Sequence, residues 1–161
     1  MHATDAFASP YALHGALSDP RRHGPACARL PRDVAALCGI VQGLLLHDYY
    51  GPRLYGPPPR HILEASRATL PVAARLDAIL ATDPAPLNCA RAPFERAVGT
   101  CRDFALLLCA LLRQQGLPAR VRCGFARYFS AAGWEDHWVC EYWHAAEGRW
   151  ALADAELDEP H

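Results

Sequence analysis

Three residues in the last third of the chain, Cys101, His137 and Asp154, are of the types that together perform nucleophilic catalysis. A cysteine thiolate attacks carbonyl carbons, but it needs a neighbouring group that accepts and returns a proton. A third group usually orients that acceptor, and histidine with a carboxylate is the common combination. Because the three residues are far apart in the sequence, the fold has to bring them together.

The residues around Cys101 predict a helix that begins at this cysteine. Thr100 is a good N-cap, and Asp103 stands three residues later, which is the spacing of a capping box. Leucines at helical spacing follow as far as Leu112. Cys101 is therefore expected in the first turn, where unpaired backbone N–H groups and the helix dipole stabilise an anion such as a thiolate. Cys109 falls among the leucines and is expected in the core.

After this helix the sequence alternates with a period of two, which predicts β-strands. In the first stretch Cys123 and Phe125 alternate with Arg120 and Arg122, so the cysteine and the phenylalanine are expected on a buried face. Two further alternating stretches follow. We expect a meander of three antiparallel strands packed against the helix, over residues 119–129, 137–143 and 150–154.

The pairing of the second and third strands decides whether His137 and Asp154 can meet. If Trp143 faces Trp150, antiparallel numbering places Val139 opposite Asp154. His137 then lies on the same face as Asp154, one diagonal step away, which side chains can bridge. A slip of one residue would move Asp154 to the opposite face.

The first hundred residues predict helices and connections. We expect a helix from Asp33 to the turn-forming residues 48–52, two short helices over 61–69 and 71–81, and an irregular connection over 87–99. Residues 1–32, rich in proline and glycine, are expected to form a loosely structured arm. The expected class is α+β, with one domain over residues 33–161 whose helical first half and nucleophile helix pack on a small antiparallel sheet.

Three sequence blocks carry a family resemblance: the seven residues from Gly99 to Ala105, the block Asp136–Val139 and the block Trp150–Asp154. In order and spacing they resemble the Cys, His and Asp blocks of the transglutaminase-like superfamily, relatives of the papain-type cysteine proteases. The resemblance covers roughly residues 61–154. It implies a transglutaminase-like or papain-like core.

The resemblance also implies roles. Cys101 would be the nucleophile, His137 its general base and acid, and Asp154 the orienting group, with Asp158 as the alternative carboxylate. The family implies attack on an amide or ester carbonyl, a covalent thioester, and release to water or to an amine. We expect a peptidase or amidase acting on a peptide or protein, in preference to a cross-linking enzyme.

Two questions stay open at this level. A domain of this family can keep the fold without activity and serve as a structural or protein-interaction module. The oxyanion hole would take the backbone N–H of Cys101 and a second donor. The side chains considered for that second donor are Tyr49, Tyr50, Tyr55 and Trp134.

Composition excludes several other classes of protein. The 161 residues are 52% hydrophobic and 20% charged, with a net charge of −1, so no strong field attracts nucleic acid or an anionic membrane. All 16 basic residues counted as Lys or Arg are arginines, which excludes lysine Schiff-base chemistry and a P-loop lysine. No apolar run approaches the ~20 residues of a membrane span, and the first residues lack the pattern of a secretory signal. We expect a cytoplasmic protein.

The seven cysteines suggest neither a disulfide framework nor a metal centre. Their number is odd, and no C-x-x-C pair occurs, so no metal and no cofactor are expected. Cys27 and Cys89 fall in irregular segments, where exposure is the simple expectation.

Overall fold

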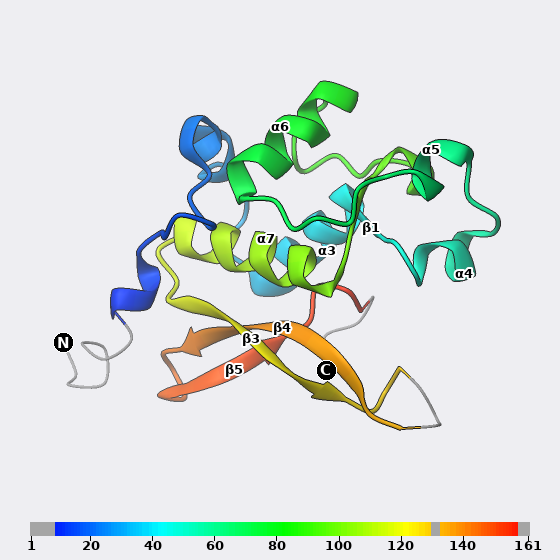
Figure 1. Cartoon of the computed structure of the whole chain (residues 1–161). Helices are drawn as coiled ribbons and strands as arrows, with labels where there is room; N and C mark the ends of the chain where they lie inside the picture. Colours follow the sequence, from blue (N-terminus) through cyan, green and yellow to red (C-terminus); the bar gives the residue numbers. More distant parts are fainter. Residues whose placement is uncertain (1–8, 130–132, 158–161) are drawn as a thin grey trace.

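The computed structural model, which describes residues 9–129 and 133–157, is built around helix α7 (Cys101–Gln114). One side of α7 packs on a three-stranded sheet, and its other side packs against α3 (Val34–Leu44) and α6 (Val72–Thr82) (Figure 1). Leucines of α7 and α3 are almost completely buried between these layers. The expected α+β class is confirmed, and the predicted helix begins at Cys101 as expected.

The three-stranded sheet is the predicted antiparallel meander. Its strands are β3 (Ala119–Ala126), β4 (Glu135–His144) and β5 (Arg149–Ala153), in the order β3-β4-β5. Trp143 pairs with Trp150, as predicted, and the ladder ends at the pair of Cys140 with Ala153. Asp154 therefore follows directly after the last pair, on the side of the sheet that the register predicted.

The structure also contains a two-stranded sheet that the sequence did not predict. Strand β1 (Leu45–His47) runs parallel to β2 (Ala97–Gly99), and each has only three residues. The expected helix from Asp33 to about residue 48 therefore ends early, at Leu44, and part of the expected connection over 87–99 is a strand. Because β2 runs directly into Thr100 and α7, this small sheet places the end of β1 beside the start of α7.

The remaining elements are short. The predicted helix over 61–69 is reduced to α5 (Arg60–Leu63), and residues 64–70 are not helical. Pro71 disfavours helical backbone at Leu70, the residue before it. The predicted helix over 71–81 is α6, and Pro71 is its N-cap. The other short helices are η1 (Ser9–Ala12), η2 (Arg21–His23), α2 (Gly24–Cys27), α4 (Gly51–Tyr55) and η3 (Pro93–Glu95).

The structure corrects three of the burial predictions. Cys27 is fully buried in the core, whereas Cys89 is exposed as expected. Cys123 and Phe125 are exposed, although the sequence predicted a buried face. The hairpin of β3 and β4 extends past the N-terminal end of α7 (Figure 1), so that no helix covers the outer half of β3.

Over the described ranges, no helix combines the length and the apolar character that crossing a bilayer requires.

A buried ion pair fixes the start of α7. Arg75 of α6 donates to Asp103 Oδ1 at 2.7 Å and to the backbone oxygen of Val98 in β2 at 2.8 Å. Asp103 Oδ2 accepts the backbone N–H of Thr100 at 2.9 Å, which is the predicted capping interaction. The two charged side chains are 7% and 1% exposed. This pair therefore joins α6, β2 and the first turn of α7.

Replacing Arg75 with methionine should destabilise the protein strongly, because it leaves the Asp103 carboxylate buried without a charged partner. We expect the free energy of unfolding in urea to fall by about 3 kcal/mol. The control is Arg60→Ala, which breaks the exposed Arg60–Glu64 pair and should cost about 0.5 kcal/mol or less. Equal losses in the two variants would contradict the role given to the buried pair.

Candidate active site

Cys101 lies where a substrate can reach it. The residue is partly exposed in the first turn of α7. It borders a cavity of about 500 Å³, whose walls also include His137, Trp138, Tyr50 and Phe129. The unpaired N–H groups of the helix start therefore face an accessible space, as the capping pattern predicted.

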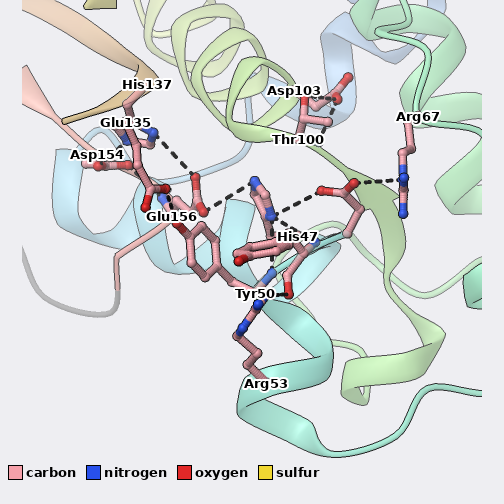
Figure 2. A network of polar contacts seen from close by, with 12 residues as sticks. His47, Tyr50, Arg53, Arg67, Thr100, Asp103, Glu135, His137, Asp154 and Glu156 are labelled. Carbon is pink, nitrogen blue, oxygen red and sulfur yellow. Dashed lines mark hydrogen bonds and ion pairs between the residues drawn. The ribbon is translucent and has the colours of Figure 1, made fainter. Parts of the chain in front are cut away.

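The structure brings the three predicted site residues together. The Cys101 thiol and the imidazole of His137, which is near the start of β4, line the same cavity and interact closely enough for Cys101 to raise the pKa of the imidazole. His137 Nε2 lies 2.6 Å from Asp154 Oδ2. Since Nε2 is engaged by Asp154, Nδ1 is the ring nitrogen left to meet the thiol. Figure 2 shows His137 and Asp154 side by side.

His137 carries a proton across the neutral range. Burial by itself lowers the pKa of this imidazole. The hydrogen bonds with Asp154 and Cys101 and the negative charges of Asp154 and Glu156 outweigh burial and raise the pKa to about 10. An imidazolium next to a cysteine sulfur favours the thiolate.

Asp154 is held by contacts on both oxygens. Tyr128 donates its hydroxyl to Oδ2 at 2.8 Å, and the backbone N–H of Glu156 donates to Oδ1 at 3.1 Å. Aromatic rings also enclose the imidazole, and Phe129 packs edge-on at 4.6 Å between centroids. The orientation of His137 is thus fixed by groups from the segment after β3 and from the segment after β5.

A second histidine, which the sequence analysis missed, lies at the same site. His47 is the last residue of β1, and one of its ring nitrogens, Cys101 Sγ and a Glu156 oxygen all lie within 4.8 Å of one another. The backbone N–H groups of Tyr49 and Tyr50 donate to His47 Nδ1 at 3.2 and 3.4 Å.

The groups next to Nδ1 bear on which nitrogen of the His47 ring carries the proton. Asp48 Oδ1 also lies 3.2 Å from His47 Nδ1. The two backbone N–H groups can only donate and favour an unprotonated Nδ1 with the ring proton on Nε2, whereas the Asp48 carboxylate at the same nitrogen favours a proton on Nδ1. Burial lowers the pKa of His47, which keeps the ring neutral.

Glu156 is the second residue that the sequence analysis missed. Its carboxylate lies between the two histidines, with Oε1 3.4 Å from His47 Nε2 and Oε2 3.8 Å from His137 Nδ1 (Figure 2). The side chain is 5% exposed, and neither oxygen has a hydrogen-bond donor among the described residues. Burial, together with the charges of Asp154 and Asp48, raises its pKa to about 7 against the opposing charge of His137.

The sequence held one signal for Glu156 and none for His47. Glu156 follows Asp154 by two residues, so an extended chain puts both on one face. His47 ends a run of leucines that also fits the end of a helix, and its strand pairs with residues far along the chain.

The structure also places the four side chains predicted as possible second oxyanion donors. Tyr50 borders the cavity and donates its hydroxyl to Glu135 at 2.8 Å, and Tyr49 also borders it. Tyr55 borders a neighbouring cavity, and Trp134 is 67% exposed. The alternative carboxylate, Asp158, lies outside the described residues.

Among residues 9–129 and 133–157, two sets of side chains have the donor types and spacing to hold a metal ion. They are His47, Cys101 and Glu156, and His137, Asp154 and Glu156, each with donor atoms within 4.8 Å of one another. Both sets consist of residues already placed at the site.

Replacing Glu156 with glutamine should change stability in a pH-dependent way. A carboxyl whose pKa is raised by folding, here from 4.5 to about 7, stabilises the protein at low pH and loses that contribution as the pH rises through 7. The stability of Glu156→Gln relative to the parent protein should therefore rise by about 2 kcal/mol between pH 5 and pH 8. Urea denaturation at both pH values measures this difference.

The matched control is Glu147→Gln, at the exposed turn between β4 and β5. This side chain loses little water on folding, so its replacement should give no comparable change with pH. A pH-independent effect of Glu156→Gln would contradict the burial of a titrating carboxyl.

Comparison with known proteins gives a family and a fold. Residues 64–155 match the transglutaminase-like superfamily. No curated protein matches the chain. A crystal structure of a candidate cysteine protease from Cytophaga hutchinsonii superposes with a TM-score of 0.57 at 18% identity.

That similarity covers 91% of this chain but only 40% of the C. hutchinsonii chain, so the present sequence spans less than half of the solved protein. At this identity the superposition supports the fold alone. The match over residues 64–155 extends over more than half of the chain and contains Cys101, His137 and Asp154. The chain belongs to the transglutaminase-like superfamily.

Proposed function

We propose that the protein is a cysteine-dependent acyl-transfer enzyme that hydrolyses amide bonds in a peptide or protein through a thioester on Cys101. The observation that carries the proposal is the continuous chain of contacts from the Cys101 thiol through His137 to Asp154. The sulfur lies at an accessible helix start, and the imidazole beside it is protonated at neutral pH.

The proposed reaction has two halves. The Cys101 thiolate attacks the carbonyl carbon, His137 gives its proton to the leaving amine, and cleavage of the C–N bond leaves a thioester. Water then attacks the thioester while His137 takes up a proton. The carboxylic acid leaves, and cleavage of the C–S bond restores the Cys101 thiolate beside the protonated His137. Asp154 keeps the ring of His137 oriented in both halves.

His47 is the second oxyanion donor in this proposal. In this proposal the ring proton is on Nε2, which the two backbone N–H groups on Nδ1 favour, and one ring nitrogen of His47 lies within 4.8 Å of the Cys101 sulfur. A neutral imidazole can donate this proton without becoming a competing base. Together with the backbone N–H of Cys101, it would stabilise the negative oxygen of the tetrahedral intermediate.

The inactive interaction module predicted as the alternative requires no activated sulfur. A histidine held protonated next to a reachable thiol, with its partner carboxylate fixed by Tyr128, favours the enzyme. The choice of water over an amine as acceptor is part of the proposal, and adding a primary amine to the assay distinguishes hydrolysis from transamidation.

Alkylation by iodoacetamide tests the activated sulfur. At pH 7 we expect Cys101 to be labelled at least about tenfold faster than Cys89 and Cys123, which are exposed cysteines outside the site. His137→Gln should bring the rate at Cys101 down to that of the two control cysteines. Peptide mapping by mass spectrometry gives all three rates in one sample, and equal rates in the parent protein would refute the proposed nucleophile.

Replacing His47 with alanine tests the oxyanion donor separately. We expect kcat/KM for amide hydrolysis to fall by about 10²–10³, because a donor to the developing oxyanion is lost. Alkylation forms no oxyanion, so the rate at which iodoacetamide labels Cys101 should stay within about twofold, since the thiolate and its imidazolium remain. A parallel loss of both rates would show that His47 acts on the sulfur instead.

A further inference from the structure

A second cavity, of about 450 Å³, adjoins the cavity over Cys101. The two share the wall residues His47, Tyr50, Phe129 and Glu156, so they lie on either side of this group. A recess of this size is in the range of sites that enclose a small ligand or a side chain.

The inner walls of this second cavity are apolar. Leu45 and Leu46 of β1 and Phe104 of α7 are at most 4% exposed. Leu54 and Tyr55 of α4 border the same cavity but are 67% and 41% exposed. Exposed apolar side chains around an apolar recess indicate a surface that is covered by a ligand.

Two arginines at this cavity lack a charged partner. Arg53 lies over the ring of Tyr49, 3.4 Å from its centroid, and donates to the backbone oxygen of Tyr49. Arg96 donates to the backbone oxygen of Arg91 and to the hydroxyl of Tyr55. Both guanidinium groups are thus held by neutral groups, and no carboxylate among the described residues is within ion-pair distance of either.

Arginines elsewhere in the described residues are of both kinds. Arg60 and Arg75 each pair with a carboxylate at 2.7 Å, whereas Arg113 is held by neutral oxygens, as Arg53 and Arg96 are. What distinguishes Arg53 and Arg96 is their place at this cavity. An ordered guanidinium without such a pair, at the edge of an apolar recess, offers its free N–H donors to a planar anion from outside, and a carboxylate fits them best.

We propose that this cavity is the specificity site for the substrate, and that it takes an apolar side chain with a carboxylate next to it. The inference rests on the proposed function only in calling the ligand a substrate. The apolar side chain would lie against Leu45, Leu46 and Phe104, and the carboxylate would meet Arg96 and Arg53. That carboxylate can belong to a neighbouring aspartate or glutamate, or to the C-terminus of a peptide.

Binding to the Cys101→Ala variant tests the proposal without catalysis. The probes are fluorescent octapeptides of alanine and glycine that carry a central Leu-Glu, Leu-Gln, Leu-Lys or Ser-Glu pair. A second set of octapeptides ends in leucine and has either a free C-terminal carboxylate or a C-terminal amide. Fluorescence anisotropy gives each Kd, and circular dichroism checks that each variant is folded.

If the carboxylate is a side chain, the Leu-Glu peptide should bind about tenfold more tightly than the Leu-Gln peptide. If the carboxylate is a C-terminus, the peptide acid should bind about tenfold more tightly than the peptide amide. The set that shows the preference therefore identifies the source of the carboxylate. Ser-Glu should bind about tenfold more weakly than Leu-Glu. Arg96→Glu in the same background should abolish the preference for the carboxylate and favour Leu-Lys. The matched control is Arg149→Glu, at the first residue of β5, which should leave every ratio unchanged.

Equal affinities for acid and neutral probes in both sets would overturn the proposal, as would the same loss in Arg149→Glu as in Arg96→Glu. Hydrolysis of the peptides by the parent protein distinguishes a failure of the specificity site from a failure of the proposed function. Hydrolysis without any preference for a carboxylate would refute the specificity site alone. Selective binding with no hydrolysis of the preferred peptides would refute the proposed function and leave this site standing.

Discussion

The position of the Cys101 sulfur depends on the buried ion pair of Arg75 and Asp103. One carboxylate accepts the Arg75 guanidinium and the backbone N–H of Thr100, and the same guanidinium binds the backbone oxygen of Val98. Two charges removed from water are tolerated only when such partners satisfy them. The first turn of α7 is therefore fixed against α6 and β2 at a point two residues from Cys101, and the parallel pairing of β1 with β2 brings His47 to the same place.

Around that fixed sulfur the fold collects ionisable groups whose environments differ. The pKa of His137 is elevated because its imidazole interacts with the side chains of Asp154 and Cys101, whereas burial lowers the pKa of His47 and keeps that ring neutral. One imidazole is thus suited to carry a proton, and the other is suited to donate a hydrogen bond. Glu156 between them has a pKa of about 7, so its charge changes in the range in which such a site would operate.

The features that could be predicted from the sequence are set by local or paired patterns. The capping residues Thr100 and Asp103 locate the start of α7, and the facing pair of Trp143 with Trp150 gives the register that brings His137 to Asp154. The small parallel sheet could not be predicted, because its three-residue strands pair across about fifty residues of chain and carry no alternation of their own. His47 was missed for that reason. The exposure of Cys123 depends on where the hairpin passes the end of α7, which alternation along a strand does not encode.

Intact-protein mass spectrometry after mixing with an activated ester tests the central claim most directly, because it observes the acyl group on the enzyme. The account predicts a single acyl adduct that maps to Cys101, forms within the first turnover, decays in water and is absent from the Cys101→Ala variant. Adducts spread over Cys89 and Cys123, or the same adduct in the Cys101→Ala variant, would contradict it.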